Sequence, residues 1–324
     1  MAGVLRATAF GRSQFRNTSS AAAAGVGRGH SLLPYSLVAP IVAFEGLFVI
    51  YPIVRALLLA FHTTSFGVTK FAGLANFRAM LHDSFFWSAL QTTFEFAAIM
   101  VIVWLGLGLG VALLMNWSFP GRGVVRALLT VPWAIPAVPV VLDFTLMFDP
   151  QFGVINRFAA LLPGVNHHIF WLSSPTLAFV AIIMMVGWTG FPFFALVLLS
   201  SLQAISPDLY DAAKVDGADA LKRFRAITIP AIQPSLALAA LLGFVFAFQQ
   251  FPIIYLSTGG GPGTATSTLA LTVYQQGIQF FNYNLAGAMA IVGLFLALIV
   301  TVLFIVFERR LTRTRRLEAN QVLL

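Results

Sequence analysis

The sequence predicts an all-α polytopic membrane protein with six transmembrane helices. Of the 324 residues, 59% are hydrophobic and 32 are Phe, which is well above the roughly half apolar content of a soluble domain. The apolar residues gather in runs that reach the length of about 20 residues that a helix needs to cross a bilayer. No run shows the alternating ten-residue pattern of a barrel strand. Because backbone groups in lipid need internal partners, a helical bundle is the remaining option.

Six apolar runs are expected to span the membrane, and they divide the chain into a central domain and two tails. A transmembrane domain is predicted over residues 31–308, between a flexible basic tail at 1–30 and a second basic tail at 309–324. A cleaved signal peptide is not expected, since no short apolar stretch with a small-residue cleavage site follows the first charges. The predicted spans are Leu32–Phe61, Ala89–Met115, Val124–Phe148, Thr176–Leu202, Pro234–Leu256 and Leu285–Phe307.

The net charge of +8 is distributed unevenly along the chain. If the N-terminus is cytoplasmic, the outer segments hold only Lys70, Arg78 and Arg157, while the tails and inner loops hold 15 of the 19 Lys and Arg residues. This asymmetry follows the positive-inside rule. It predicts that both termini are cytoplasmic, and it accounts for the basic charge without nucleic acid as a partner.

The densest charge cluster lies in the predicted inner loop, Asp211–Pro230, with four Lys/Arg and three Asp in 20 residues. Ser206-Pro207 predicts a helix start, and Gly217 predicts a left-handed turn after a first helix that ends near Asp216. Asp219 is expected to cap a second helix, Ala220–Ile227, which Pro230 stops. Helices this short need a partner surface to be stable, so the pattern favours a docking element over a solvated linker.

The loop sequence LYDAAKVDGADALKRFRAITIPAIQPSL resembles the signature of permease subunits of binding-protein-dependent ABC importers. Asp211 stands where the family usually has Glu, which shortens its reach by one methylene. Further resemblance extends from about residue 32 onward, and FQQFPIIYLSTGGGPGTATSTL is similar to the maltose-permease-like, sugar-importing branch. The loop residues that match the signature are Asp211, Ala212, Ala213, Gly217, Phe224 and Pro230.

The resemblance implies a type I importer bundle in a bacterial cytoplasmic (inner) membrane, with residues 206–230 as the coupling loop that sits in a cleft of an ATPase subunit. It also implies a second homologous permease chain, two ATP-binding cassette subunits and an external solute-binding protein. The chain shows no G-x-x-x-x-G-K phosphate loop. Therefore no cofactor is expected in this chain, ATP and Mg are assigned to the partner subunits, and the chain is not expected to be an enzyme.

Uncharged residues in two spans form the predicted substrate site. Trp188 and Gly190 lie in GWTGFPFFAL, where Gly190 and Pro192 are expected to let the helix bend and expose its backbone. Gln249 and Gln250 lie in FAFQQFPII. An aromatic ring and two amides suit the ring face and hydroxyls of a sugar. The alternative is core packing by Trp188 and hydrogen bonding between helices by the Gln pair.

The resemblance places these positions in part of the transmembrane sugar site of maltose-permease-like proteins. Trp188 and Gly190 match that pattern. Phe193 replaces a Tyr and lacks its hydroxyl, and Gln249 and Gln250 replace Asn.

Four charged residues within spans are further candidates, because charge in a membrane is costly and commonly functional. A structural ion pair or a wetted vestibule is favoured for each, and Glu95 and Asp143 are the candidates for an outer vestibule. Gly106, Gly108 and Gly110 are expected to allow close helix packing. His167 and His168 have no third ligand at suitable spacing, so no metal site is predicted. The four charged residues are Glu45, Arg55, Glu95 and Asp143.

The predicted function is ATP-driven import of a mono-, di- or oligosaccharide delivered by the external binding protein. Import of a polyol or glycerol phosphate by the same mechanism is the alternative. An ion-driven secondary transporter or channel is the rival class, and it should show inverted repeats and ionisable residues near the midplane. Only Glu45 comes near that requirement.

Overall fold

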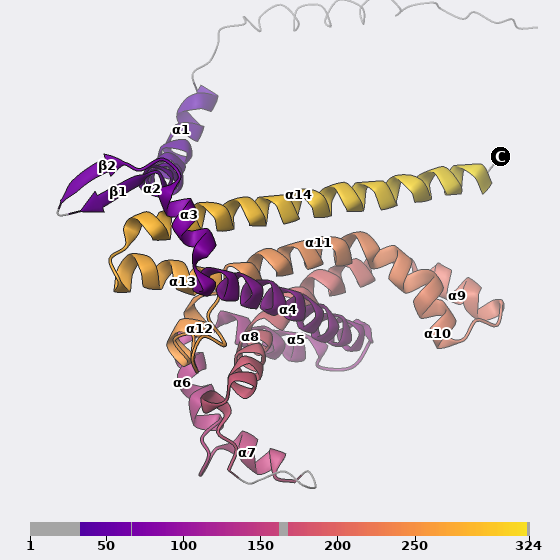
Figure 1. The fold of residues 1–324 in the computed structure, drawn as a ribbon. Helices are drawn as coiled ribbons and strands as arrows, with labels where there is room; N and C mark the ends of the chain where they lie inside the picture. Colours follow the sequence, from indigo (N-terminus) through magenta and orange to yellow (C-terminus); the bar gives the residue numbers. More distant parts are fainter. Residues whose placement is uncertain (1–32, 66, 162–167, 323–324) are drawn as a thin grey trace, which may run out of the picture. The chain divides into compact units, whose positions relative to one another are not determined.

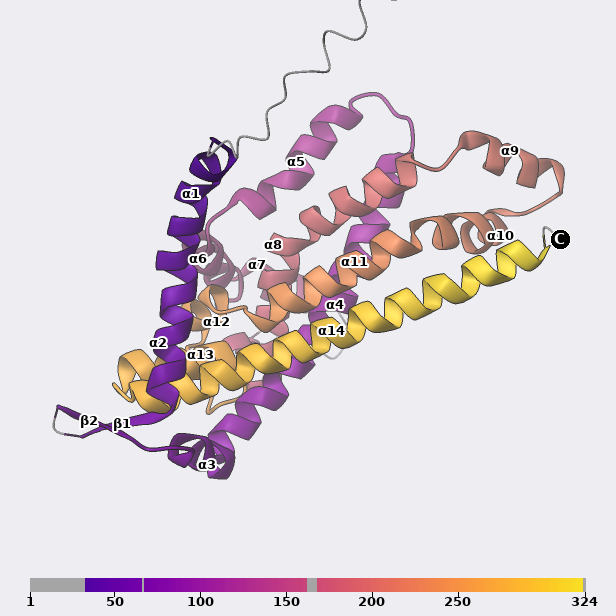
Figure 2. The same cartoon turned by 90° about the horizontal axis from the view of Figure 1, so that it is seen from above.

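The computed structural model of the protein describes residues 33–65, 67–161 and 168–322, drawn as a ribbon in Figures 1 and 2. The chain divides into two compact units, Met1–Ile53 and Val54–Leu324. The described part of the first unit holds α1 (Leu33–Glu45), a π-helical turn (Gly46–Ile50) and the start of α2 (Tyr51–Ala60). The second unit holds all the remaining elements.

The second unit is almost entirely helical, as predicted, and its elements follow in this order: β1 (His62–Ser65), β2 (Val68–Phe71), α3 (Ala75–His82), α4 (Ser84–Asn116), α5 (Arg122–Ala134), α6 (Ala137–Met147), α7 (Val154–Ala159), a 3₁₀ turn (Trp171–Ser173), α8 (Pro175–Gln203), α9 (Pro207–Val215), α10 (Ala220–Arg223), a π-helical turn (Phe224–Thr228), α11 (Ile229–Phe248), α12 (Pro252–Ser257), α13 (Leu269–Tyr274), a π-helical turn (Gln275–Gln279) and α14 (Tyr283–Val322).

The membrane spans agree with the predicted fold class. Five stretches of the described chain are long and apolar enough to cross a membrane, and a sixth is added if α5 and α6 count as one span. The five are Ser36–Ala60, Ser84–Asn116, Pro175–Gln203, Ala220–Ser257 and Tyr283–Glu308. Near the end of the chain, α11 and α14 lie side by side in both views (Figures 1 and 2).

The predicted span Val124–Phe148 is bent in the structure, where α5 and α6 meet at an angle of 96°. Pro136 stands at the break, and Ile135 before it is extended, with φ −79° and ψ 127°. Proline lacks an N–H, and its ring disfavours helical geometry in the residue before it. The bend follows from this local chemistry.

A short antiparallel hairpin, which the sequence did not predict, follows the first span. In β1 and β2, His62 pairs with Phe71 and Ser65 with Val68. The amide of Asn76 closes the base of the hairpin by donating hydrogen bonds to the carbonyls of Ala60 (2.9 Å) and His62 (2.8 Å). The fold class is unchanged, since these two strands form the only sheet in the part of the chain that the structure describes.

The core of the second unit is built where α4 packs on α8. The indole of Trp104 stacks on the ring of Phe194 with centroids 5.1 Å apart, and its Nε1 donates to the Val186 carbonyl at 3.1 Å. A Cβ added to Gly108 would lie 2.9 Å from Cβ of Phe194. The predicted packing role is therefore confirmed for Gly108, whereas Gly106 and Gly110 have no such neighbour within 4 Å in the described chain.

The local structure of the charged loop was predicted in most respects. The Ser206 hydroxyl accepts from the Asp208 N–H at 3.3 Å, and Asp219 Oδ1 accepts from the Lys222 N–H at 2.7 Å. Gly217 has a φ of +75°, which is a left-handed conformation that a residue with a Cβ adopts only at a cost. The two predicted caps and the glycine turn are confirmed.

The expectation that Pro230 ends the second helix is wrong. The chain continues from α10 through the π-helical turn Phe224–Thr228 into α11, which begins at Ile229. A proline ring collides with the carbonyl four residues earlier in an α-helix, and a π-helical turn widens the backbone at that point. The same arrangement precedes Pro52, where the π-helical turn Gly46–Ile50 leads into α2.

The predicted fifth span is also interrupted. After α11 ends at Phe248, three residues separate it from α12, which begins at Pro252. Since Pro252 occupies the first turn of α12, its missing N–H costs that helix nothing. The break places Gln249 and Gln250 outside regular helix.

The contact at Gly108 predicts a large difference between neighbouring glycines. Gly108→Ala should lower the free energy of unfolding by about 1–3 kcal/mol, because the new methyl group would collide with the backbone of α8. Gly106→Ala is the matched control and should be neutral or stabilising, since Ala is favoured over Gly in a helix by about 1 kcal/mol. Thermal melting of the purified assembly measures both. Equal losses would show that the contact is not specific to Gly108.

Candidate functional site

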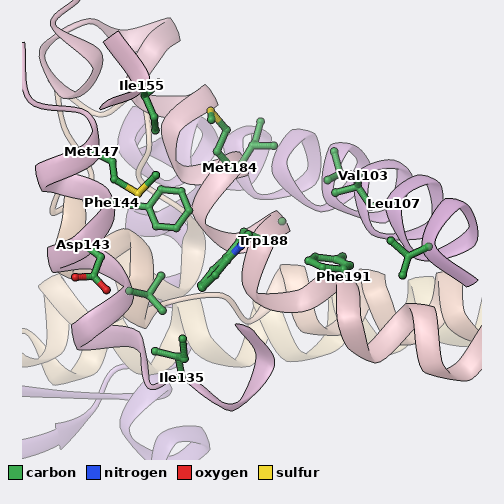
Figure 3. Close-up of a pocket in the computed structure, with 14 residues that line it drawn as sticks. Val103, Leu107, Ile135, Asp143, Phe144, Met147, Ile155, Met184, Trp188 and Phe191 are labelled. Carbon is green, nitrogen blue, oxygen red and sulfur yellow. The ribbon is translucent and has the colours of Figure 1, made fainter. Parts of the chain in front are cut away.

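A cavity of about 740 Å³ lies in the second unit where α4, α6, α7 and α8 come together (Figure 3). Its volume is within the range of about 300–1,000 Å³ that is usual for ligand pockets. Ile135 reaches its wall from the break between α5 and α6. The lining residues are Val103, Leu107, Val111, Ile135, Val140, Asp143, Phe144, Met147, Ile155, Ile183, Met184, Gly187, Trp188 and Phe191.

Trp188, predicted for the substrate site, and Asp143, predicted for an outer vestibule, both line this cavity. Trp188 of α8 is 37% exposed and packs edge-to-face against Phe144 of α6, with ring centroids 5.6 Å apart. Asp143 precedes Phe144 on the same helix and is also among the lining residues. In Figure 3 the ring of Phe144 points toward Trp188, whereas the Asp143 carboxylate lies farther from Trp188, at the side of α6. The cavity therefore combines an aromatic surface with one carboxylate.

Asp143 is the one ionisable side chain among the described residues that line the cavity. It is exposed, and neither a hydrogen bond nor an ion pair joins its carboxylate to another described residue. Both oxygens are therefore available as hydrogen-bond acceptors.

The structure separates Gly190 and Phe193 from Trp188. A Cβ on Gly190 would overlap the indole of Trp104, so Gly190 serves helix packing. Pro192 lies inside α8, which is continuous from Pro175 to Gln203. Since proline has no N–H, the carbonyl of Trp188 four residues earlier lacks its helical hydrogen bond. Phe193 is five residues from Trp188, or about 140° around a helix.

Phe193 instead joins an aromatic cluster on another side of α8. Its ring centroid lies 6.0 Å from that of Trp133 in α5 and 5.7 Å from that of Phe246 in α11. Both of these partners are exposed in the chain by itself. This cluster forms a second aromatic surface, distinct from the cavity that holds Trp188.

Gln249 and Gln250 do not line the cavity of Trp188. Gln249 is exposed, three residues after Phe246. The Gln250 side-chain oxygen accepts from the N–H of Phe251 at 3.1 Å, and its carbonyl accepts from the Thr268 hydroxyl at 3.4 Å. Gln250 thus stabilises the break between α11 and α12, and the predicted substrate residues Trp188, Gln249 and Gln250 do not share one cavity.

The other charged candidates are Glu95, Glu45 and Arg55, and none of them is among the residues that line the cavity. Glu95 lies outside the cavity, and its Oε1 accepts from the Gln91 amide at 2.7 Å. Glu45 is the last residue of α1, and Arg55 lies in α2. Among the described residues, no ion pair joins any of these three groups to an opposite charge. The prediction of a structural ion pair or a wetted vestibule for these groups stays a prediction.

The histidine pair can be followed only in part, because His167 lies outside the described residues. His168 Nδ1 is 2.8 Å from the carbonyl of Pro150. Within the described ranges, no three His, Asp or Glu side chains are grouped closely enough to hold a metal ion.

The loop of α9 and α10 is attached to the bundle by a side-chain hydrogen bond. The hydroxyl of Tyr210 in α9 lies 2.9 Å from the hydroxyl of Thr228, which is buried in the π-helical turn before α11. Asp211 pairs with Lys214 at 2.7 Å, but both side chains are exposed, and such a pair contributes only about 0–1 kcal/mol. Asp211 therefore remains available to another molecule.

Apolar side chains on the same loop are uncovered. Leu209, Val215 and Leu221 are all exposed, and Val215 is 89% exposed. Asp211, Ala212 and Gly217 are exposed beside them, while Ala213 and Phe224 are half-buried. Exposed apolar groups on short, capped helices are typical of a surface that binds a protein partner.

Sequence reasoning missed most of the cavity wall, including Ile135, Phe144, Met184 and Phe191. The stretch VPWAIPAVPV contains one usable signal, because its repeated prolines predict a broken helix. The apolar lining residues carry no such signal, since they look like any lipid-facing or core residue.

Comparison with known proteins gives this geometry a context. A relative named as the sulfoquinovosyl glycerol transport system permease protein SmoG of Agrobacterium fabrum is 36% identical over 290 residues, covering 89% of this chain and 92% of its own length. The trehalose/maltose transport system permease protein MalF of Thermococcus litoralis is 34% identical, covering 84% and 92%. The sn-glycerol-3-phosphate transport system permease protein UgpA of Yersinia enterocolitica is 32% identical, covering 87% and 96%.

The fold matches a solved transporter. A chain in the crystal structure of a bacterial alginate ABC transporter, in complex with an alginate pentasaccharide-bound periplasmic protein, superposes with a TM-score of 0.76 at 22% identity, covering 87% of this chain and 96% of that one. The family described as "Binding-protein-dependent transport system inner membrane component" matches residues 104–316. This chain is a member of that family.

Proposed function

We propose that this chain is the permease subunit of an ATP-driven sugar importer, with both termini, including the basic tails 1–30 and 309–324, in the cytoplasm. Membership of the binding-protein-dependent family makes it a transport subunit and not an enzyme, with ATP hydrolysis in separate subunits. Membership of this family also excludes the alternative of an ion-driven secondary transporter. The remaining questions are which surfaces bind the partners and which solute crosses.

The observation that carries the proposal is the uncovered apolar surface of α9 and α10 beside Asp211 and Ala212. This surface would dock in an ATPase subunit, which binds ATP and Mg. Two such ATPase subunits, a second homologous permease chain and an external solute-binding protein would complete the assembly. On ATP binding the ATPases would move the docked loops as rigid bodies and change the side on which the bundle is open.

Sugar as the solute is supported by the cavity and by the relatives. Trp188 offers an aromatic face to the apolar side of a sugar ring, and Asp143 offers two acceptors to its hydroxyls. Two of the relatives named above carry a sugar in their names. The relative named for sn-glycerol-3-phosphate keeps glycerol phosphate as a second candidate.

Transport should depend on the ring of Trp188. Trp188→Ala should lower uptake of the sugar by about tenfold or more, since a buried aromatic contact contributes a few kcal/mol, while the assembly still forms. Trp117→Ala is the control, because Trp117 is exposed just after α4 and does not line the cavity. Uptake into vesicles with the sugar-loaded binding protein measures both. Normal uptake by Trp188→Ala would exclude this cavity from the sugar path.

Coupling should depend on the backbone conformation at Gly217. Proline cannot adopt the φ of +75° found there, because its ring holds φ near −65°. Gly217→Pro should therefore abolish stimulation of the ATPase by the loaded binding protein. Gly121→Pro places the same strain at a φ of +82° in a different loop and should keep most of the stimulation. An equal loss of ATPase stimulation in Gly217→Pro and Gly121→Pro would contradict the coupling role proposed for this loop.

The bond between Tyr210 and Thr228 should carry motion from α9 into α11. Tyr210→Phe and Thr228→Val each remove it, and each should reduce sugar transported per ATP severalfold. If the bond is the cause, the double variant should be no worse than either single one. Uptake and phosphate release, measured on the same vesicles, give this ratio. Additive losses would mean that the two hydroxyls act separately.

A further inference from the structure

We propose that Asp143 gives the cavity beside Trp188 a negative potential and thereby selects uncharged solutes over anionic ones, such as sugar phosphates and sugar acids. The choice of solute rests on the proposed function above, whereas the potential itself does not. Nothing in the comparisons assigns a role to Asp143.

The first step is the charge of the cavity wall. Of its 14 lining residues, 13 have no ionisable side chain, and no Lys, Arg or His is among these described residues. Arg157 lies on α7, the helix that contributes Ile155 to the wall, but it forms no ion pair with Asp143 in the described chain. The carboxylate therefore sets the sign of the local charge.

The second step is the reach of that charge. Apolar walls have a low dielectric constant and concentrate the field of a charge within a cleft. A cavity of about 740 Å³ has dimensions comparable with the Debye length of about 8 Å at physiological salt. A solute in the cavity consequently feels the carboxylate wherever it lies.

The third step is hydrogen bonding. An ionised carboxylate only accepts hydrogen bonds, and the hydroxyls of a neutral sugar can donate to both of its oxygens. The phosphate or carboxylate group of an anionic solute offers acceptors where donors are needed, and two like charges would be desolvated together. Asp143 thus matches the neutral sugar and opposes the anion.

The inference distinguishes this chain from two of the relatives named above. sn-Glycerol 3-phosphate and sulfoquinovosyl glycerol, which carries a sulfonate, are anions, whereas the trehalose and maltose named for a third relative are uncharged. Asp143 places this chain with the carriers of uncharged sugars.

The first experiment measures the potential directly. The chain has no cysteine, so Met184→Cys introduces a single thiol on the cavity wall. In membrane vesicles holding the full assembly, the thiol is labelled with cationic and anionic methanethiosulfonate reagents, and labelling is read on this chain's own gel band. With Asp143 present, the ratio of the cationic to the anionic labelling rate should be higher than in a cavity whose wall carries no charge.

Adding Asp143→Asn should lower the cation-to-anion rate ratio by about threefold or more, because the attraction and repulsion both vanish. Adding Glu95→Gln is the matched control: it removes an acid of α4 that does not line the cavity, and it should leave the ratio unchanged. A ratio that does not respond to Asp143→Asn, or that responds equally to both changes, overturns the inference.

The second experiment tests the solute. Maltose or trehalose should protect the Met184→Cys thiol from labelling, glycerol 3-phosphate and glucose 6-phosphate should not, and Asp143→Asn should allow the phosphates to protect. If the phosphates protect as well as a neutral sugar in the presence of Asp143, the selectivity is wrong while the sugar path stands. If no solute protects, both the sugar path through this cavity and its selectivity are overturned.

Discussion

The contact between α4 and α8 decides the rotation of α8, and the candidate site depends on that rotation. Trp104 stacks on Phe194 and donates to the carbonyl of Val186, while Gly108 lets the backbones approach. The bond to a buried carbonyl and the stacked rings hold α8 in one orientation about its own axis. As a result Trp188 faces the cavity, and Phe193 faces a second aromatic cluster with Phe246.

Prolines set the interruptions of the helices on which the site is built. Pro136 turns α6 away from α5, which brings Asp143 and Phe144 to the cavity wall beside Ile135. Pro252 begins α12 after a break, and Pro230 follows a π-helical turn without ending the helix. The outcome at each proline depends on whether the preceding backbone can widen or must break.

Direct contacts connect the loop of α9 and α10 to the helix that holds Trp188. Tyr210 bonds to Thr228 at the start of α11. Farther along, Ser235 of α11 lies 2.6 Å from Ser201 of α8, hydroxyl to hydroxyl. A displacement of α9 can therefore reach α8 along this route through α11 as well as through the direct chain connection between Gln203 and Pro207. Such a chain of contacts transmits a change only if its members have two stable arrangements, which the proposed importer cycle would supply.

The sequence by itself determined the fold class, the number and order of the apolar spans, and the local structure of the charged loop. Spans follow from the length of apolar runs, and the caps at Ser206 and Asp219 and the turn at Gly217 are decided within a few residues. Local chemistry of this kind can be read directly from neighbouring residues. The family resemblance carried by the same loop pointed to the family to which the chain belongs.

Only the tertiary structure decided which candidates share a site. In the structure Trp188 and Asp143 line the same cavity, and Gly190 packs against Trp104. Gln249 and Gln250 lie at the break after α11. These outcomes depend on the rotation of each helix and on contacts between segments far apart in the chain, such as Trp104 with Val186. In an almost uniformly apolar span, hydrophobic periodicity does not mark an inner face, so side-chain packing between helices settles it.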